Sequence, residues 1–285
     1  MIVLNKTQRS KDYSEIASYY RPGHADYTYD CKYGFRDYTG GGRSSGRETV
    51  GRVAAGAIAA KLLKEMGITI DAYTKSIGPV EISYEKFELG QRFENEVWMP
   101  DPLAAEKAEA YLEECIKNQN SSGGIIECVI KGVPAGLGEP CFEKLSANLG
   151  KAILSIGAVK GFEIGDGFMA ASATGLTNND AFSYNNEGKI EKKTNHAGGV
   201  LGGISDGSDI IFRAAVKPTP SISAAQETIT QSGENIVVSV KGRHDPVIVP
   251  RAVVVVECMA AITVLDALLM NMSARLDGIK RFYEK

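Results

Sequence analysis

The chain has the length and composition of an ordinary globular protein. It contains 285 residues, of which 44% are hydrophobic and 24% charged, and these values exclude a disordered chain, a collagen-like repeat and a disulfide-stapled miniprotein. The formal net charge is -3, so no general basic field attracts nucleic acid and an anionic ligand must be held by local arginines. The five cysteines never stand in a CxxC spacing, which favours a reducing compartment over disulfides or structural zinc.

The first quarter of the chain passes from irregular to helical. Residues 2–4 have the pattern of a strand, and residues 5–42 are polar, aromatic and glycine-rich, as in a long ordered loop that carries function. Residues 46–66 have apolar side chains at helical spacing, and Ser45 with Glu48 forms a capping-box pattern at the start. The small side chains within this helix predict close packing against another helix.

The later elements follow no regular alternation. Asp101 is a typical N-cap and Pro102 a typical first residue for a second helix that extends to about Lys117. A third helix is predicted at about 141–155, a last one at about 251–274, and strands near 125–131, 159–164, 210–216 and 236–241. This mixed order predicts an α+β fold in which antiparallel sheets pack on long helices.

The last predicted helix is apolar on nearly all sides. It contains Glu257 and Asp266, which favours a buried core helix over a membrane span. The first residues form too short an apolar run for a signal peptide. We therefore expect a cytoplasmic protein with no membrane or nucleic-acid partner.

The sharpest local pattern is the run GGGRSSGRET at residues 40–49. Its glycines let the backbone approach a ligand, and two arginines and two serines add donors ahead of a helix N-terminus, which together suit an anion. The run is neither a Walker A motif nor a GxGxxG motif, so it does not indicate an ATPase or a Rossmann domain. Taken alone, it fits a plain glycine-rich loop before a capped helix slightly better than an anion site.

Two further segments contain residues suited to acid–base chemistry. His24 stands in a turn between Arg21 and Asp26 and can transfer protons near neutral pH, although a lone loop histidine is more often only hydrogen-bonded. Arg243 can hold a carboxylate or phosphate through two parallel hydrogen bonds, and Asp245 can act as a base if it is partly desolvated. The alternative for the second segment is a plain Asp-Pro turn.

The remaining patterns are less specific. Two Gly-Gly pairs within residues 195–205 suit a backbone against a flat ligand, or simply a glycine-rich hairpin. Residues 217–221, KPTPS, form a rigid turn with one cation and two hydroxyls, which is as often structural. The three histidines lack metal-ligand spacing, so no metal site is expected.

Together, and in this order, these segments resemble the chorismate synthase family. The resemblance covers nearly the whole chain and rests on residues 8–13, 21–29, 40–49, 158–165, 195–205, 217–221 and 243–246. It implies one domain over residues 1–285 with a β-α-β sandwich, in which long helices pack between antiparallel sheets, and a homotetramer. It also implies a carbon-oxygen lyase acting on phosphates, which converts 5-enolpyruvylshikimate 3-phosphate to chorismate and phosphate by a 1,4-anti elimination with reduced FMN.

The resemblance also assigns roles to single residues. It implies FMN contacts from Arg43, Ser44, Ser45, Gly157, Ala158, Gly202, Lys217, Pro218, Thr219, Pro220, Ser221 and Arg243. His24 matches the histidine that helps protonate the reduced flavin, and Asp245 the acidic residue that relays a proton at flavin N5. Arg21 matches a substrate-facing arginine, and Arg47 fits an anion-binding role. NADPH is expected only if the protein reduces its own flavin.

One departure from the family concerns the start of the chain. The family opens with a Gly-Glu-Ser-His-Gly motif and phosphate-binding arginines, for which this sequence has no match. We therefore expect an N-terminally incomplete domain that binds FMN poorly and turns over little or not at all, since a general acid contributes about 10²–10⁴-fold. The alternative is a non-catalytic, truncated remnant that binds FMN or another anion.

Overall fold

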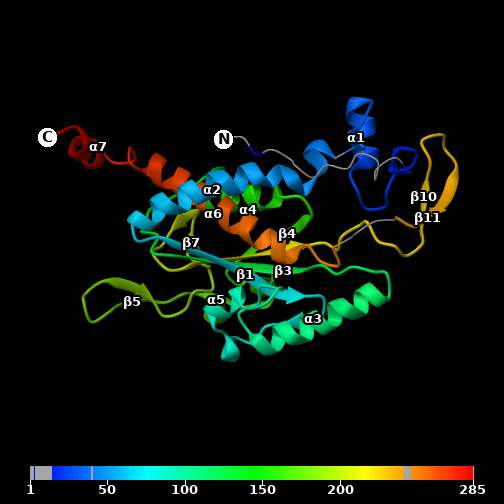
Figure 1. The fold of residues 1–285 in the computed structure, drawn as a ribbon. Coiled ribbons are helices and arrows are strands. Elements are labelled where there is room, and N and C mark those ends of the chain that lie inside the picture. Colours follow the sequence, from blue (N-terminus) through cyan, green and yellow to red (C-terminus); the bar gives the residue numbers. More distant parts are fainter. Residues whose placement is uncertain (1–2, 4–14, 40, 241–244, 285) are drawn as a thin grey trace.

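The centre of the fold is a five-stranded antiparallel sheet (Figure 1). The structure, a computed structural model, describes residues 3, 15–39, 41–240 and 245–284. The strand order is β2-β1-β3-β9-β4, with bounds β1 Thr69–Ile77, β2 Val80–Glu81, β3 Gly124–Lys131, β4 Val159–Ile164 and β9 Ile210–Val216. In the register, Ala72 lies opposite Cys128, which in turn lies opposite Phe212, and all three are fully buried.

Helices cover both faces of this sheet (Figure 1). Three of them pack together on one face: α2 Thr49–Glu65, α4 Leu145–Leu154 and α6 Val249–Asn271. The fourth long helix, α3 Pro102–Lys117, lies on the other face. The main core therefore lies between the sheet and the α2-α4-α6 layer, where Leu63, Leu149 and Val256 are buried.

Helix α6 is the central helix of that layer. Within the described residues it is the one helix long and apolar enough to cross a membrane. The core helix of a globular protein is just as apolar as a membrane-spanning helix. Helix α6 contacts α2, α4, β1 and β3, as a core helix does. The prediction of a buried core helix is confirmed, and so is the close packing of the small residues of α2, because Gly56 and Ala59 are buried there.

Smaller elements extend from this body. Around the sheet are α1 Asp26–Tyr33, α5 Gly175–Asn178, α7 Leu276–Tyr283, and the ribbons β5 Phe182–Tyr184 with β6 Ile190–Lys192, β7 Val200–Leu201 with β8 Ile204–Ser205, and β10 Gln226–Ile229 with β11 Asn235–Val238. Short 3-10 turns are η2 Glu15–Ala17, η3 Gly42–Ser44, η4 Gly46–Glu48, η5 Tyr84–Lys86, η6 Leu89–Phe93 and η7 Gly167–Ser172. Helix α1 and the β10-β11 ribbon project at the same end of the molecule (Figure 1), where Tyr19, ahead of α1, forms a β-bridge with Thr230, just after β10.

The predicted α+β class with antiparallel sheets is confirmed, and so are several element bounds. Helix α3 begins where expected, because the Asp101 carboxylate accepts hydrogen bonds from the backbone N–H groups of Leu103 and Ala104. Helix α2 begins later than expected. Glu48 pairs with Arg52 at 3.0 Å, and a 3-10 turn precedes the helix.

Several elements were not predicted, among them α1 and β1. Residues 26–33, expected within a loop, form α1. Its polar sequence has no apolar stripe from which a helix could be predicted, and Asp26 is its only buried residue. Strand β1 was missed because polar residues interrupt its apolar pattern. The third helix is also shorter than expected, since it begins at Leu145. Of the strand expected at residues 2–4, only Val3 is described, and it is not in a strand.

Candidate functional site

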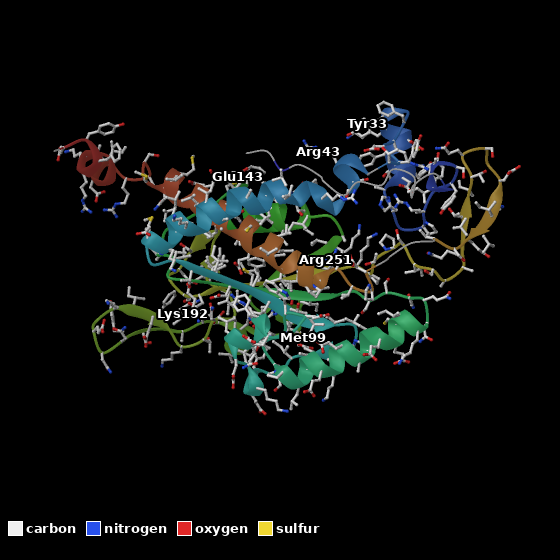
Figure 2. The ribbon with its side chains drawn as sticks, viewed as in Figure 1. Tyr33, Arg43, Met99, Glu143, Lys192 and Arg251 are labelled. Atoms are coloured by element: carbon white, nitrogen blue, oxygen red, sulfur yellow. The ribbon has the colours of Figure 1, made fainter. Side chains whose placement is uncertain are left out.

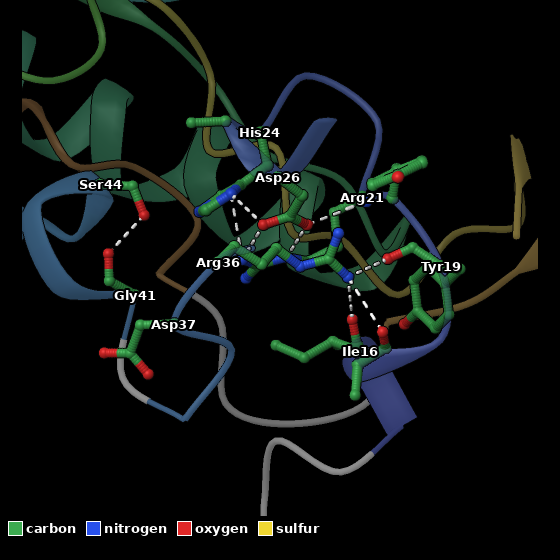
Figure 3. Close-up of polar contacts among 12 residues, drawn as sticks. Ile16, Tyr19, Arg21, His24, Asp26, Arg36, Asp37, Gly41 and Ser44 are labelled. Atoms are coloured by element: carbon green, nitrogen blue, oxygen red, sulfur yellow. Dashed lines mark hydrogen bonds and ion pairs between the residues drawn. The ribbon is translucent and has the colours of Figure 1, made fainter. Parts of the chain in front are cut away.

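Three side chains in and before α1 form one ion-paired group, drawn in Figure 3. Arg21 Nε donates to Asp26 Oδ2 and Arg21 Nη2 donates to Asp26 Oδ1, both at 2.8 Å. The backbone N–H of Arg21 donates to Asp26 Oδ2 at 3.0 Å, and His24 Nδ1 lies 2.8 Å from Asp26 Oδ1. The arginine and the histidine expected in the site are thus brought together on a carboxylate that is only 5% exposed.

Asp26 is the first residue of α1, and its surroundings favour the ionised form. Burial raises the pKa of Asp26, but hydrogen bonds and charge from Arg21 and His24 outweigh burial and hold that pKa well below its usual value. The positive end of the helix dipole favours the same anion. Asp26 is therefore a carboxylate, able only to accept hydrogen bonds, at every pH near neutrality.

The loop that carries His24 is fixed by a second arginine. Arg36 Nη2 donates to the backbone carbonyls of Ile16 at 2.8 Å, Ala17 at 3.2 Å and Tyr19 at 2.7 Å, while Nη1 donates to Asp30 at 2.9 Å (Figure 3). Buried carbonyls need such donors because an unpaired polar group is costly away from water. Arg36 therefore holds the chain before the His24 turn against α1.

Lys217 joins this turn to the main sheet. Its Nζ donates to the carbonyl of Gly23, and its backbone N–H donates to the carbonyl of Ala158 at 3.0 Å. Gly23 has φ +67°, and a Cβ placed there would lie 3.2 Å from Cβ of Pro220, so turn and segment are in close contact. Three predicted parts of the site, residues 21–24, 157–158 and 217–221, therefore meet at one place.

The polar groups at this junction suit an anion. Burial and the positive charge of Lys160 both lower the pKa of Lys217. Within the described part of the chain, neither lysine forms an ion pair with a carboxylate, and the buried Thr219 Oγ1 has no hydrogen-bond partner. Two like charges without a counter-ion and an orphaned hydroxyl are the donor set that a phosphate satisfies. The residues present therefore fit a phosphate group.

Asp245 lines a cavity of about 750 Å³ between α3 and the first turn of α6. Its Oδ2 pairs with Arg251 Nη1 at 2.8 Å. The cavity wall also includes the carboxylates of Glu94, Glu96, Glu106, Glu109 and Glu113. This wall is strongly acidic and disfavours an anionic ligand.

Backbone contacts connect the Asp245 turn with the Lys217 segment. The carbonyl of Pro246 accepts a hydrogen bond from the N–H of Ser122 at 2.7 Å. The hydroxyl of the preceding Ser121 donates to the carbonyl of Thr219 at 2.7 Å. One turn, residues 121–122, thus contacts both segments. Arg243, the cofactor contact predicted two residues before Asp245, lies outside the described residues.

The glycine-rich run leads into α2, as expected. Arg43 is exposed, and Figure 2 shows it near the start of that helix. The Ser44 hydroxyl donates to the carbonyl of Gly41 at 2.5 Å, and Ser45 Oγ accepts from the backbone N–H of Arg47 at 3.3 Å. Both predicted serines thus shape the turn, while Arg43 and Arg47 extend from it.

Gly202 does not lie with the Lys217 junction. It occupies the β7-β8 turn with φ +61° and open space beside its Cα. The next residue, Gly203, accepts from the N–H of Leu145 at the start of α4, whereas Ala158 follows the end of that helix. Gly202 and Lys217 therefore lie toward opposite ends of α4 and β9 within one chain.

Sequence reasoning left two residues out of the site. Asp26 pairs with both Arg21 and His24. Its position two residues after the histidine could have indicated this contact. Lys160 belongs beside Lys217 because β4 pairs with β9, a relationship that no local pattern reveals. Among the described residues, no group of three or more His, Cys, Asp or Glu side chains is placed to hold a metal ion.

Comparison with known proteins decides the family. The family model of chorismate synthase matches residues 1–269. The chain belongs to the chorismate synthase family. Chorismate synthase of Agathobacter rectalis is 67% identical over 285 residues, which are 100% of this chain and 77% of that protein, and chorismate synthase of Lachnoclostridium phytofermentans is 66% identical over 100% of this chain and 78% of that protein.

A solved structure agrees with this family. A crystal structure of chorismate synthase superposes with a TM-score of 0.74 at 31% identity, covering 91% of this chain and 75% of that one. The resemblance seen in the sequence is confirmed, together with the fold class and the lyase assignment that the family carries. The comparisons favour this assignment over the non-catalytic remnant.

Proposed function

We propose that this chain converts 5-enolpyruvylshikimate 3-phosphate to chorismate and phosphate with reduced FMN as cofactor. The observation that carries the proposal is the junction of the His24 turn with Lys217, where a proton-transferring group, an ion-paired arginine and an uncompensated cationic pair lie together. A substrate with one phosphate and two carboxylates needs such a site, because each anion requires charged or N–H donors in place of water.

The cofactor is held, in this proposal, by the segments that meet at Lys217. Lys217 and Lys160 with the free hydroxyl of Thr219 take the flavin phosphate, and the turn at residues 157–158 offers backbone. Ala158 adopts φ +71°, an uncommon conformation for a residue with a side chain, and such backbone often lies beside a ligand. When bound, reduced FMN supplies the electron density that the elimination of phosphate requires.

The protein's own residues position charges and move protons. Arg21, fixed on Asp26, presents its guanidinium to a carboxylate or phosphate of the substrate. His24 offers a ring nitrogen for proton transfer. Asp245 accepts a proton on a carboxylate oriented by Arg251. Arg43 and Arg47 add positive charge near the start of α2.

Assembly and location complete the proposal. A homotetramer in the cytoplasm agrees with free cysteines in the described chain and with several exposed apolar side chains, such as Phe168, Leu176 and Phe182. NADPH is required only if the chain reduces its own flavin. Gly202, which lies away from Lys217 in one chain, contacts FMN only if a second copy presents it.

The test is an anaerobic assay of this chain with 5-enolpyruvylshikimate 3-phosphate and chemically reduced FMN. Chorismate and phosphate are measured, and the Agathobacter rectalis chorismate synthase is assayed beside it as the reference. We expect both products in equal amounts, because the elimination releases one phosphate for each chorismate formed. Flavin binding without any product would instead favour the non-catalytic remnant.

A further inference from the structure

Four nitrogen atoms lie within hydrogen-bond distance of the Asp26 carboxylate. Its Oδ2 accepts from the backbone N–H and from Nε of Arg21, at 3.0 and 2.8 Å. Its Oδ1 faces Nη2 of Arg21 and Nδ1 of His24, both at 2.8 Å. Three of these nitrogens belong to an arginine, which always donates, so only the histidine can change its hydrogen-bonding role.

The choice of proton position on His24 follows from its two neighbours. Arg21 Nη2 lies 3.0 Å from Nδ1, and a bare Nδ1 would accept from it. The Asp26 oxygen lies nearer, at 2.8 Å, and it is negatively charged. Burial raises the pKa of Asp26, but hydrogen bonds and charge from Arg21 and His24 lower it further. A carboxylate beside a bare ring nitrogen places two lone pairs in contact, whereas a proton on Nδ1 makes a charge-assisted hydrogen bond.

We propose that Asp26 is the positioning residue of this site, which holds His24 with its proton on Nδ1 and so leaves Nε2 as the atom that exchanges protons. The same carboxylate fixes the direction of the Arg21 guanidinium. This inference rests on the proposed function for its catalytic consequence, but not for the geometry. Asp26 acts through its two partners and touches neither substrate nor cofactor in this scheme.

The variant Asp26→Asn tests the proposal at nearly constant shape. The two donors at Oδ2, the backbone N–H and Nε of Arg21, cannot lose their protons, so the amide oxygen has to take that position. The amide nitrogen then takes the place of Oδ1, where it cannot accept from Nη2 of Arg21, so both the amide and Nη2 donate toward Nδ1 of His24. The neutral ring must therefore move its proton from Nδ1 to Nε2.

The readout is ¹⁵N NMR of protein labelled only at histidine. The chain has three histidines, and His24→Gln identifies the His24 signals. In the native protein we expect Nδ1 with the shift of a protonated nitrogen and Nε2 with that of a bare one, and in Asp26→Asn the reverse. Turnover of Asp26→Asn should fall by about 10²-fold, the lower end of what general acid–base catalysis contributes.

Asp30→Asn is the matched control. Asp30 lies on the same helix and also pairs with an arginine, Arg36 at 2.9 Å, but it does not touch His24. It should leave the proton on Nδ1. Retention of Nδ1–H in Asp26→Asn, or the same exchange in Asp30→Asn, would overturn the proposal. If the native chain forms no chorismate, the proposed function fails, while the spectra still decide the role of Asp26.

Discussion

Gly56 of α2 lies directly against Cys258 of α6. A Cβ placed at Gly56 would lie 2.2 Å from Cβ and 2.7 Å from the backbone oxygen of Cys258, far inside van der Waals contact. The two longest helices therefore approach so closely that only a hydrogen atom fits between their backbones at this point. Cys258 also directs its thiol to the carbonyl of Val53, with Sγ 3.6 Å from that oxygen.

We predict that Gly56→Ala destabilises the protein. The clash involves the backbone of α6, which cannot rotate away as a flexible side chain does. The free energy of unfolding should therefore fall by about 1–3 kcal/mol. Gly51→Ala is the control, because Gly51 lies on α2 with no atom within 4 Å of its added Cβ. It should stabilise by roughly 0.5–1 kcal/mol through helix propensity. Urea unfolding of both variants measures the difference, and equal effects would contradict the close contact.

A second prediction concerns Lys192, whose side chain is 2% exposed between Asp180 and Asp206. Its Nζ lies 3.1 Å from Asp180 Oδ2 and 2.7 Å from Asp206 Oδ2. Lys192→Met leaves two buried carboxylates without their cation and should lower the free energy of unfolding by about 3–5 kcal/mol.

The control for this network is another lysine of the same ribbon. Lys189 is 74% exposed and pairs with Glu187, so Lys189→Met should change the stability by less than about 1 kcal/mol. Thermal or urea unfolding of both variants decides between them. A Lys192→Met protein as stable as Lys189→Met would show that the buried network contributes nothing.

Acid should weaken the cap of α3. Asp101 accepts backbone hydrogen bonds from Ser83, Leu103 and Ala104, and although burial raises the pKa of Asp101, these bonds lower it further than burial raises it. A pKa that is lower in the folded state gives stability above the unfolded value of about 3.9, and this stability is lost as the pH falls through the folded value.

The corresponding variant is Asp101→Ala. It should cost about 1–2 kcal/mol at neutral pH, and the difference from the native protein should shrink below about pH 4. Asp101→Asn, which keeps an accepting oxygen, should show the smaller cost at neutral pH. Urea unfolding across this pH range measures each value, and a cost that grows toward low pH would reverse the sign argued here.

The fourth prediction tests the anion site at Lys217. Lys217→Met removes the cation that meets Gly23 and should weaken FMN binding by about 10–100-fold, the loss expected for one charge-assisted hydrogen bond. Lys151→Met is the control, because Lys151 is 72% exposed and lies on α4 with Glu143 as its partner. Fluorescence titration with FMN measures both. Unchanged affinity in Lys217→Met would remove Lys217 from the cofactor site.

Sequence patterns predicted those elements whose signals are local. Asp101 and Pro102 define the start of α3 because a cap and its helix are adjacent in the chain. Strand β1 escaped prediction because Asp71 and Lys75 interrupt its apolar pattern. Their partners come from elsewhere in the chain: Asp71 pairs with Arg92 at 2.9 Å and Lys75 with Glu81 at 2.6 Å.

The order of motifs along the chain was enough to identify the family and to name residues such as His24, Lys217 and Asp245. Only the tertiary structure decided which of them meet. The contact of Lys217 with Gly23 joins residues 194 positions apart, and the separation of Gly202 from that contact follows from the length of β9 and α4. Local preferences act over a few residues, whereas the distance between two motifs depends on how the sheet and its helices pack.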